Sequence, residues 1–408
     1  MSSTLLINPT AMEAGLLAAA KARALEGPRE AAFDAFAKTG LPHKRIEGWK
    51  WTDIRSVLRE DLKLAEPDND VIAPSLFGGV KPFEITIMNG AAEWDEAPAG
   101  FTISRMDAAA LSPLAADHSL ASLAAAMAGK VVDIKIGAGA HVDRPILIRR
   151  IAGPGAVHGR VRVTLGDGAR ATLIESFDGV GRYFSNSVAE ASLGDGTTLT
   201  RFILQDGSDE GVETAVFAAT IGDASNYHQV ALLLGAKAAR IETRIAAKGQ
   251  GARIDLKSAS ALSGARHADA TSLILHEGQG VATRQIHKSA LRDQARGVFQ
   301  GKFHVARGAQ KTDARMTANA LLLSDGAEAD HKPELEIYAD DVECAHGSTA
   351  GALDEDALFY LRQRGLDNAA ARALLVEAFL GEVFSEIEHP GIQSVFHHRL
   401  AHWLRAAQ

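Results

Sequence analysis

The stretch RVRVTLGDGARATLIES, residues 160–176, contains an alternating strand, a glycine corner and a second alternating strand. Val161, Val163 and Leu165 alternate with polar residues, which places the apolar side chains on one face of an extended chain. Glycine corners of this kind recur at Gly137, Gly166, Gly194, Gly222, Gly249, Gly278 and Gly308. The successive intervals are 29, 28, 28, 27, 29 and 30 residues, so the chain carries an internal repeat of strand, tight corner and strand.

A repeat of this length with no helical pattern between its strands predicts a parallel β-helix, in which each coil buries its apolar face against its neighbours. Strands are expected before the corners at 131–136, 160–165 and 216–221, and after them at 169–176 and 197–204. A propeller blade needs about 40 residues and a leucine-rich repeat has a different consensus, so both are less favoured. The fold class is therefore mainly β.

The residues around the repeats have helical patterns, which gives three predicted regions: 1–130 helical and mixed, 131–350 β-helix, and 351–408 helical. Two helices are expected within 11–38 because Gly27-Pro28 interrupts the helical pattern there. Further along the chain we expect a strand at 83–88 and a helix at 106–128. In RIEGWKWTDI, residues 45–54, the tryptophans either anchor the helical region on its neighbour or form a partner surface. Thr52 is the expected N-cap of a helix over 53–58.

The C-terminal region predicts a helix ending near Gly365, a second helix capped by Asp367, and a last helix at 393–404. The second helix carries an apolar stripe made of Ala371, Leu375, Phe379, Val383 and Ile387. Such a stripe packs against the core or forms a docking surface, and the sequence leaves both interpretations open.

The composition excludes several function classes. Of 408 residues 46% are hydrophobic and 23% charged, as in a folded globular chain, and the net charge of −8 with no basic block argues against a nucleic-acid partner. No apolar run reaches the ~20 residues of a membrane span, and no secretory segment is evident, so we expect a cytoplasmic protein. A single cysteine agrees with a reducing compartment and leaves a cluster site short of thiolates.

The stretch PELEIYADDVECAHGSTAG, residues 333–351, holds that cysteine, Cys344, two positions before His346. On a strand both side chains share one face, with Cα atoms roughly 6.6 Å apart, and can contribute to one metal or cluster site. Gly347 is expected to turn the chain away. From the residues alone, a buried structural cysteine beside an ordinary histidine is the competing interpretation.

Motifs of familiar enzymes are missing. The sequence has no G-x-G-x-x-G before a helix, no phosphate-binding G-x-x-x-x-G-K-[ST], no H-E-x-x-H and no G-x-S-x-G. His398 and His402 lie four apart on the last predicted helix, where exposed surface is favoured over a shared metal.

Residues 299–365, which run from FQGKFHVARGAQ to LFYLRQRGL, closely resemble the signature region of the SufB/SufD family of iron–sulfur cluster scaffold proteins. At lower strength the resemblance extends over nearly the whole chain from about Pro42. RIEGWKWTDI resembles the segment typical of SufD, and the absence of further cysteines also favours SufD over SufB. The resemblance implies a right-handed parallel β-helix flanked by N- and C-terminal helical domains.

The resemblance also implies a non-catalytic scaffold subunit that pairs with a SufB-like subunit through the β-helices and binds a SufC-like ABC ATPase. His346, with Cys344 beside it, is then expected at a nascent-cluster site shared with SufB, where the cluster is transient and no cofactor is held stably by this chain. The expected ATPase-binding region is 353–387, and its expected contact residues are Leu358, Leu361, Leu375, Phe379 and Val383. Whether a flavin serves the complex, and whether the isolated chain forms homodimers, stays open.

The alternative from another class is a carbohydrate-active β-helix lyase or hydrolase, which would use clustered carboxylates in a groove along the solenoid. Corner aspartates such as Asp167 and Asp195 fall in turns, where aspartate is expected in any case. A hexapeptide-repeat acyltransferase is disfavoured because the sequence has no six-residue rhythm.

Overall fold

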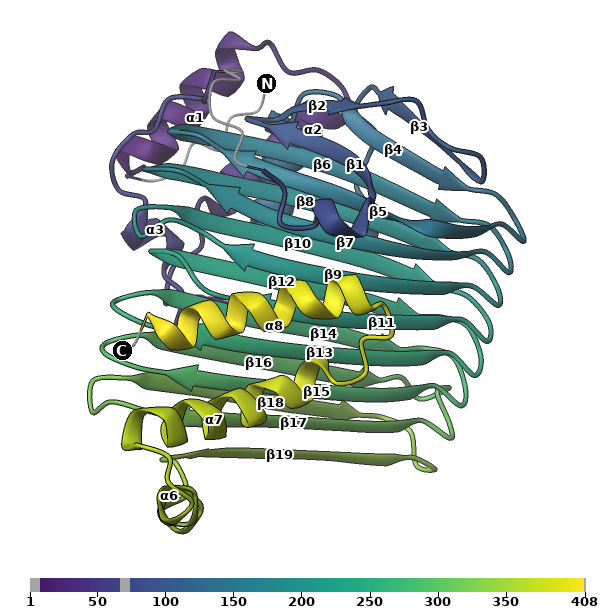
Figure 1. Cartoon of the computed structure of the whole chain (residues 1–408). Coiled ribbons are helices and arrows are strands. Elements are labelled where there is room, and N and C mark those ends of the chain that lie inside the picture. Colours follow the sequence, from purple (N-terminus) through teal and green to yellow (C-terminus); the bar gives the residue numbers. More distant parts are fainter. Residues whose placement is uncertain (1–7, 67–73, 407–408) are drawn as a thin grey trace.

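The computed structural model describes residues 8–66 and 74–406, and in it the chain winds into a solenoid of two facing sheets (Figure 1). The ten-stranded sheet has the order β19 (Glu343–Gly351), β17 (Asp313–Leu322), β15 (Ala282–Leu291), β13 (Arg253–Leu262), β11 (Asn226–Leu233), β9 (Thr198–Asp206), β7 (Arg170–Gly179), β5 (His141–Ala152), β1 (Phe83–Met88), β2 (Ala91–Trp94). The nine-stranded sheet has the order β18 (Glu328–Ile337), β16 (Arg296–Val305), β14 (His267–His276), β12 (Ala238–Ala247), β10 (Val212–Ile221), β8 (Tyr183–Leu193), β6 (Gly155–Leu165), β4 (Val131–Ile136), β3 (Phe101–Met106).

Successive strands alternate between the two sheets, so that each coil contributes one strand to each, and from β4 to β19 the pairing is parallel. The glycine corners stack: Gly222 N donates to Leu193 O at 3.0 Å, and Gly249 N donates to Ile221 O at 3.0 Å. A Cβ on Gly249 would lie 2.0 Å from the carbonyl carbon of Gly222. The predicted parallel β-helix is confirmed, and the repeat requires glycine at such corners because successive corners approach closely.

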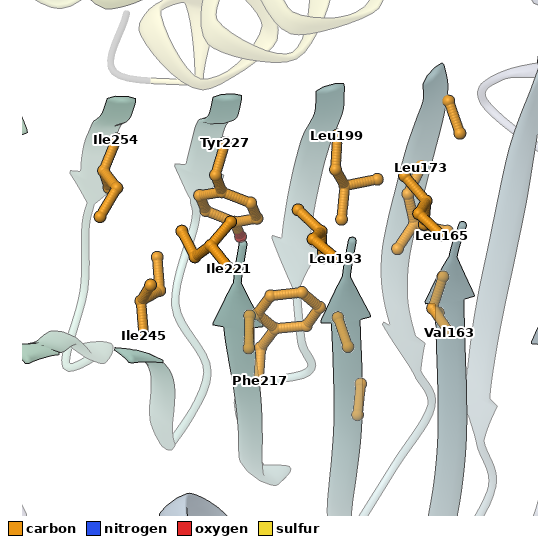
Figure 2. Packing of buried hydrophobic residues seen from close by; sticks show 14 of the residues in the cluster. Val163, Leu165, Leu173, Leu193, Leu199, Phe217, Ile221, Tyr227, Ile245 and Ile254 are labelled. Carbon is orange, nitrogen blue, oxygen red and sulfur yellow. The ribbon is translucent and has the colours of Figure 1, made fainter. Parts of the chain in front are cut away.

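The main core lies between the sheets. Figure 2 shows side chains from facing strands meeting there, with Phe217 and Tyr227 stacked at a centroid distance of 5.7 Å. The labelled residues are all buried: Val163, Leu165, Leu173, Leu193, Leu199, Phe217, Ile221, Tyr227, Ile245 and Ile254. Burial of each large apolar side chain contributes about 1.5–3 kcal/mol, so stacked coils stabilise one another.

N-terminal helices cover the outer face of the nine-stranded sheet. The elements are α1 (Ala11–Ala22), α2 (Pro28–Thr39), η1 (Glu47–Trp49), α3 (Ile54–Val57), α4 (Pro113–Ala116) and α5 (Ser119–Met127), and α5 contacts β6 and β8. The short helix η2 (Gly78–Val80) instead contacts α8 on the other sheet. The two helices within 11–38 and the strand at 83–88 are confirmed. The single helix expected at 106–128 is wrong: Met106 ends β3, and helical structure begins only at Pro113, which cannot continue a helix from before it.

The tryptophan segment anchors this region on the sheet. Trp49 is buried, with the Arg240 guanidinium 4.0 Å from its ring centroid, and the Thr52 hydroxyl donates to Asp269 Oδ2 at 2.6 Å. The anchoring interpretation is therefore confirmed. The predicted N-cap is wrong, because Asp53 accepts the Ser56 N–H at the start of α3 while Thr52 is used for the buried contact.

The C-terminal elements are α6 (Glu355–Gln363), α7 (Asn368–Gly381), η3 (Glu382–Phe384) and α8 (Pro390–Arg405). Figure 1 shows α7 and α8 lying across the outer face of the ten-stranded sheet. There Val376, Leu380 and Phe384 pack with Leu232 and Ala259. Of the predicted stripe, Ala371, Val383 and Ile387 are buried and Leu375 and Phe379 are half-buried, so it serves mainly as core. Among residues 8–66 and 74–406, no helix is both long enough and apolar enough to span a bilayer.

Candidate functional site

The solenoid ends in two strands, β18 in the nine-stranded sheet and β19 in the ten-stranded sheet. Within the described residues each pairs with one neighbour, β18 with β16 and β19 with β17. Each therefore presents a row of backbone N–H and C=O groups that the fold itself does not pair. The last coil is an open end of the molecule.

Cys344 and His346 lie on the inward face of β19. Cys344 is in register with Ala314 and His346 with Met316, and both partners are buried in the core between the sheets. Cys344 is half-buried against this core, while His346 is exposed at the opening. The shared face predicted from the sequence is confirmed. Gly347 does not turn the chain: it lies opposite Thr317 and the strand continues to Gly351.

The thiol of Cys344 is not an activated nucleophile in this chain. Burial raises its pKa, only partly opposed by a hydrogen bond with the Ala314 backbone. A cysteine reacts and binds metal as the thiolate, which its surroundings here disfavour at neutral pH. A nearby cation or a bound metal is needed to deprotonate it.

A third residue of the opening, His331 in β18, was not singled out from the sequence. Its Nδ1 shares a hydrogen bond of 2.8 Å with Ser348 Oγ of β19, which joins the two sheets at the last coil. Its register with Phe299, a core residue, places it on the inward face. The alternation that runs back from Leu335 through Pro333 was the signal that pointed to it.

The donor types at the opening suit iron, because imidazole and thiolate are both iron ligands in proteins. Their number does not suffice for a stable cluster. In the part of the chain that the structure describes, no group of three or more His, Cys, Asp or Glu side chains is arranged to hold a metal ion. Ligands from another molecule are needed to complete a site here.

Charged and apolar side chains surround the opening. Glu336 pairs with Lys302 at 2.7 Å and with His304 at 3.2 Å. Ile337 and Tyr338, at the end of β18, are 41% and 57% exposed. Exposed apolar side chains therefore lie beside an ion-paired glutamate and the unpaired edge of β18.

The residues predicted for ATPase binding differ in how deeply their side chains are buried. Leu358 and Val383 are buried within this chain, and Leu361, Leu375 and Phe379 are half-buried, with Lys288 Nζ 4.7 Å from the Phe379 ring centroid. The large apolar side chains that face solvent in this region are instead Phe359, Tyr360, Leu366 and Leu374. The buried residues of α7 are Ala371, Val376 and Leu380, so the four-residue step that includes Leu375 and Phe379 is offset from the side that faces the sheet.

The corner aspartates do not form a catalytic groove. Asp167 Oδ1 accepts the Asp195 N–H at 3.0 Å, and Asp195 Oδ1 accepts the Asp223 N–H at 2.8 Å. Each carboxylate thus links one coil to the next, as a turn residue does. His398 and His402 lie on the exposed face of α8, in agreement with the surface interpretation.

Comparison with known proteins gives two family matches. Residues 148–379 match the core domain of SufBD proteins of the SUF system for iron–sulfur cluster assembly, and residues 7–72 match the SufBD N-terminal region. The core match alone covers more than half of the chain.

Individual relatives agree with these matches. The chain is 28% identical over 374 residues to the iron–sulfur cluster assembly protein SufD of Escherichia coli, which covers 87% of this chain and 88% of SufD. It is 29% identical over 404 residues to an iron–sulfur cluster assembly SufBD family protein of Synechocystis, covering 90% of this chain and 89% of that protein. It is also 29% identical over 273 residues to the chloroplastic protein ABCI7 of Arabidopsis thaliana, covering 64% of this chain and 58% of that protein. The chain belongs to the SufBD family of iron–sulfur cluster assembly proteins.

Proposed function

We propose that this chain is the SufD-type subunit of a cytoplasmic iron–sulfur cluster assembly complex, and that it acts as a scaffold without catalytic activity of its own. Its open end would pair with a SufB-like subunit, and its C-terminal helices would bind a SufC-like ABC ATPase. His346, with Cys344, would supply part of a nascent-cluster site shared with the SufB-like subunit. In this proposal region 1–130 covers the β-helix, region 131–350 is the scaffold, and region 351–408 binds the ATPase.

One observation carries the proposal: the unpaired end of the β-helix presents an exposed imidazole, His346, on its inward face. An exposed histidine at an unpaired edge can bind a metal ion only by sharing it with ligands from a partner. The iron–sulfur unit is cargo in this scheme, and its remaining ligands come from the SufB-like subunit. The half-buried Cys344 thiol can join after a bound iron lowers its pKa.

The ATPase-binding part of the proposal is supported by α6 and the start of α7. Phe359 and Tyr360 of α6 are 62% and 57% exposed, and Leu374 of α7 is 45% exposed. Helix α6 makes its main contacts with α7 rather than with the solenoid, and Figure 1 shows it beyond the last coil. We place the direct contacts on this exposed side, while the buried Leu358 and Val383 hold the helices in position.

The cluster site is tested by His346→Ala in the co-expressed complex, followed by iron and sulfide analysis of the purified assembly. We expect the subunits to co-purify while iron and sulfide fall by about tenfold or more, the effect of losing a metal ligand or its close support. His398→Ala, which removes an exposed histidine of α8, is the matched control. Undiminished cluster content in His346→Ala would defeat the site assignment.

The docking surface is tested by Phe359→Asp combined with Leu374→Asp. Both side chains are exposed, so the free energy of unfolding of the isolated chain should change by less than about 0.5 kcal/mol. Co-purification with the ATPase should be lost, because two charges would be buried without partners. Ile337→Asp, at the open end, serves as the control that should leave ATPase binding intact. Retained binding in the double variant would place the ATPase elsewhere.

A further inference from the structure

Strand β19, which carries Cys344 and His346, is held by little packing of its own. It pairs with β17 along one edge, and all of its residues except Cys344 are exposed. The residue after His346 is Gly347, where a Cβ would meet nothing within 4 Å. Glycine has no side chain to pack and leaves the backbone more freedom than any other residue. The local packing of β19 therefore does not fix where His346 lies.

One hydrogen bond connects this strand to the opposite sheet. His331 Nδ1 of β18 lies 2.8 Å from Ser348 Oγ of β19. Within the described part of the chain, it is the one side-chain hydrogen bond between these two strands. Ser348 follows His346 by two residues and shares its face of the strand, with Cα atoms roughly 6.6 Å apart. A restraint on Ser348 therefore also restrains the backbone that carries His346.

The His331 ring is itself anchored in the buried core. It packs edge-on against the rings of Phe299 and His287, at centroid distances of 6.3 and 6.2 Å. Those two rings are both buried and stack on each other at 5.0 Å, and Ser258 Oγ forms a hydrogen bond of 2.8 Å with His287 Nδ1. The hydrogen bond of Ser348 thus connects β19 to the packed interior of the solenoid rather than to another surface side chain.

The polar groups of His331 act through one ring atom. Burial lowers the pKa of His331, although the Asp330 charge opposes the shift, so the ring is neutral at neutral pH. Its Nε2 atom is enclosed by the protein and has no hydrogen-bond partner among the described residues. Nδ1 is the atom that remains, and the Ser348 hydroxyl can either donate to it or accept from it. His331 is therefore directed at Ser348 and not at a bound metal ion.

The next hydroxyl of β19 has a different partner. Thr349 Oγ1 donates to Asn319 Oδ1 of β17 at 2.8 Å. This bond lies within the ten-stranded sheet and adds to the backbone pairing that β17 and β19 already make. The two neighbouring hydroxyls of Ser348 and Thr349 therefore separate a contact between the sheets from a contact within one sheet.

We propose that His331 is a positioning residue of the open end. Through Ser348 it fixes β19 relative to β18 and holds His346 at the place where ligands from a partner can share an iron ion with it. This inference rests on the proposed function of His346. His346 contacts the cargo in this scheme, and His331 acts on the cargo only by way of Ser348 and the strand between them.

The test measures the rate of cluster formation by the co-expressed complex, with sulfide supplied and the concentration of ferrous iron varied. Ser348→Ala and His331→Phe both delete the hydrogen bond, and phenylalanine keeps a ring against Phe299. Each should raise the iron concentration for the half-maximal rate by about tenfold, the effect of losing a group that orients a metal ligand. Ser348→Thr keeps the hydroxyl and should behave as the wild type, as should the matched control Thr349→Val. A merely destabilised complex would lower the maximal rate without changing the half-maximal iron concentration.

The double variant, with Ser348→Ala and His331→Phe combined, sharpens the test. It should lose no more than either single variant, because both changes remove the same bond. Ser348→Ala changes an exposed residue and carries the test if His331→Phe prevents folding. An unchanged half-maximal iron concentration in Ser348→Ala, or additive losses in the double variant, would overturn the inference.

His346→Ala separates this inference from the function on which it rests. If His346→Ala impairs cluster formation while Ser348→Ala behaves as the wild type, the positioning role of His331 fails and the proposed function stands. If His346→Ala has no effect on cluster formation, both fail together.

Discussion

The two ends of the solenoid differ in how they finish their sheets. At the first end, β2 runs antiparallel to β1 and β3 antiparallel to β4, and Phe83 and Phe101 close the core with ring centroids 5.1 Å apart. At the last end, β18 and β19 are parallel strands with a free edge, and His346 is exposed on the inward face. The chain closes one end with its own residues and leaves the other open.

The difference has a physical basis. A parallel solenoid exposes an unpaired backbone edge and an uncovered core at each end, and either a cap or a binding partner must satisfy them. The first end has turned strands and aromatic rings, while the last end has residues that are only half-buried, such as Leu335 and Cys344. Stability should therefore depend on the closed end, and assembly on the open end.

The largest effect is expected when one apolar side chain is truncated to alanine at each end, which compares what the two ends contribute to stability. Phe83→Ala, at the closed end, should lower the free energy of unfolding by about 3–5 kcal/mol, because the side chain is 2% exposed and its removal leaves a cavity. Leu335→Ala, half-buried at the open end, should cost about 1 kcal/mol or less in the isolated chain. Urea denaturation measures both values, and equal costs would contradict the comparison.

The pH dependence of stability should originate in the enclosed middle coils. Burial raises the pKa of Glu213 from 4.5 to about 7, although a hydrogen bond from Gln205 opposes the shift. Since the folded state holds this proton more tightly than the unfolded state, Glu213 should lower stability by roughly 3 kcal/mol as pH rises from about 4.5 to 7.

Glu213→Gln should remove that part of the pH dependence, and denaturation of both proteins at several pH values measures it. Glu343→Gln, an exposed carboxylate of β19 at the open end, is the control and should change stability little across the same window. If the difference in free energy of unfolding between the wild type and Glu213→Gln does not change with pH, the prediction is contradicted.

The smallest expected effect compares two glycines. Gly249→Ala would bring a Cβ to 2.0 Å from the Gly222 backbone, so this overpacked corner should lose about 1–3 kcal/mol. A Cβ at Gly347 of β19 would meet nothing within 4 Å, and Gly347→Ala should stay within about 0.5 kcal/mol. Thermal unfolding of the two variants gives the comparison. If the partner's strand lies against this face, Gly347→Ala should show its effect in assembly instead.

Local patterns predicted much of this molecule. Alternating apolar residues and glycine corners predicted the coils. Gly27-Pro28 predicted the break between α1 and α2, and Asp367 predicted the start of α7. Thr52 was assigned a local role, as a helix cap, although it bonds Asp269 more than two hundred residues later. His331 was missed because its partner Ser348 lies in the opposite sheet. Contacts across such distances leave no periodic signal in a single chain.

By itself the sequence determined that successive strands stack into a parallel solenoid, because a unit that recurs every 28 residues or so buries its apolar face efficiently by stacking on its neighbours. It also determined that Cys344 and His346 share a strand face. Only the tertiary structure decided which end is open and which side of α7 faces the sheet. These features depend on where distant segments come to rest against one another, and that is settled by the packing of the whole chain.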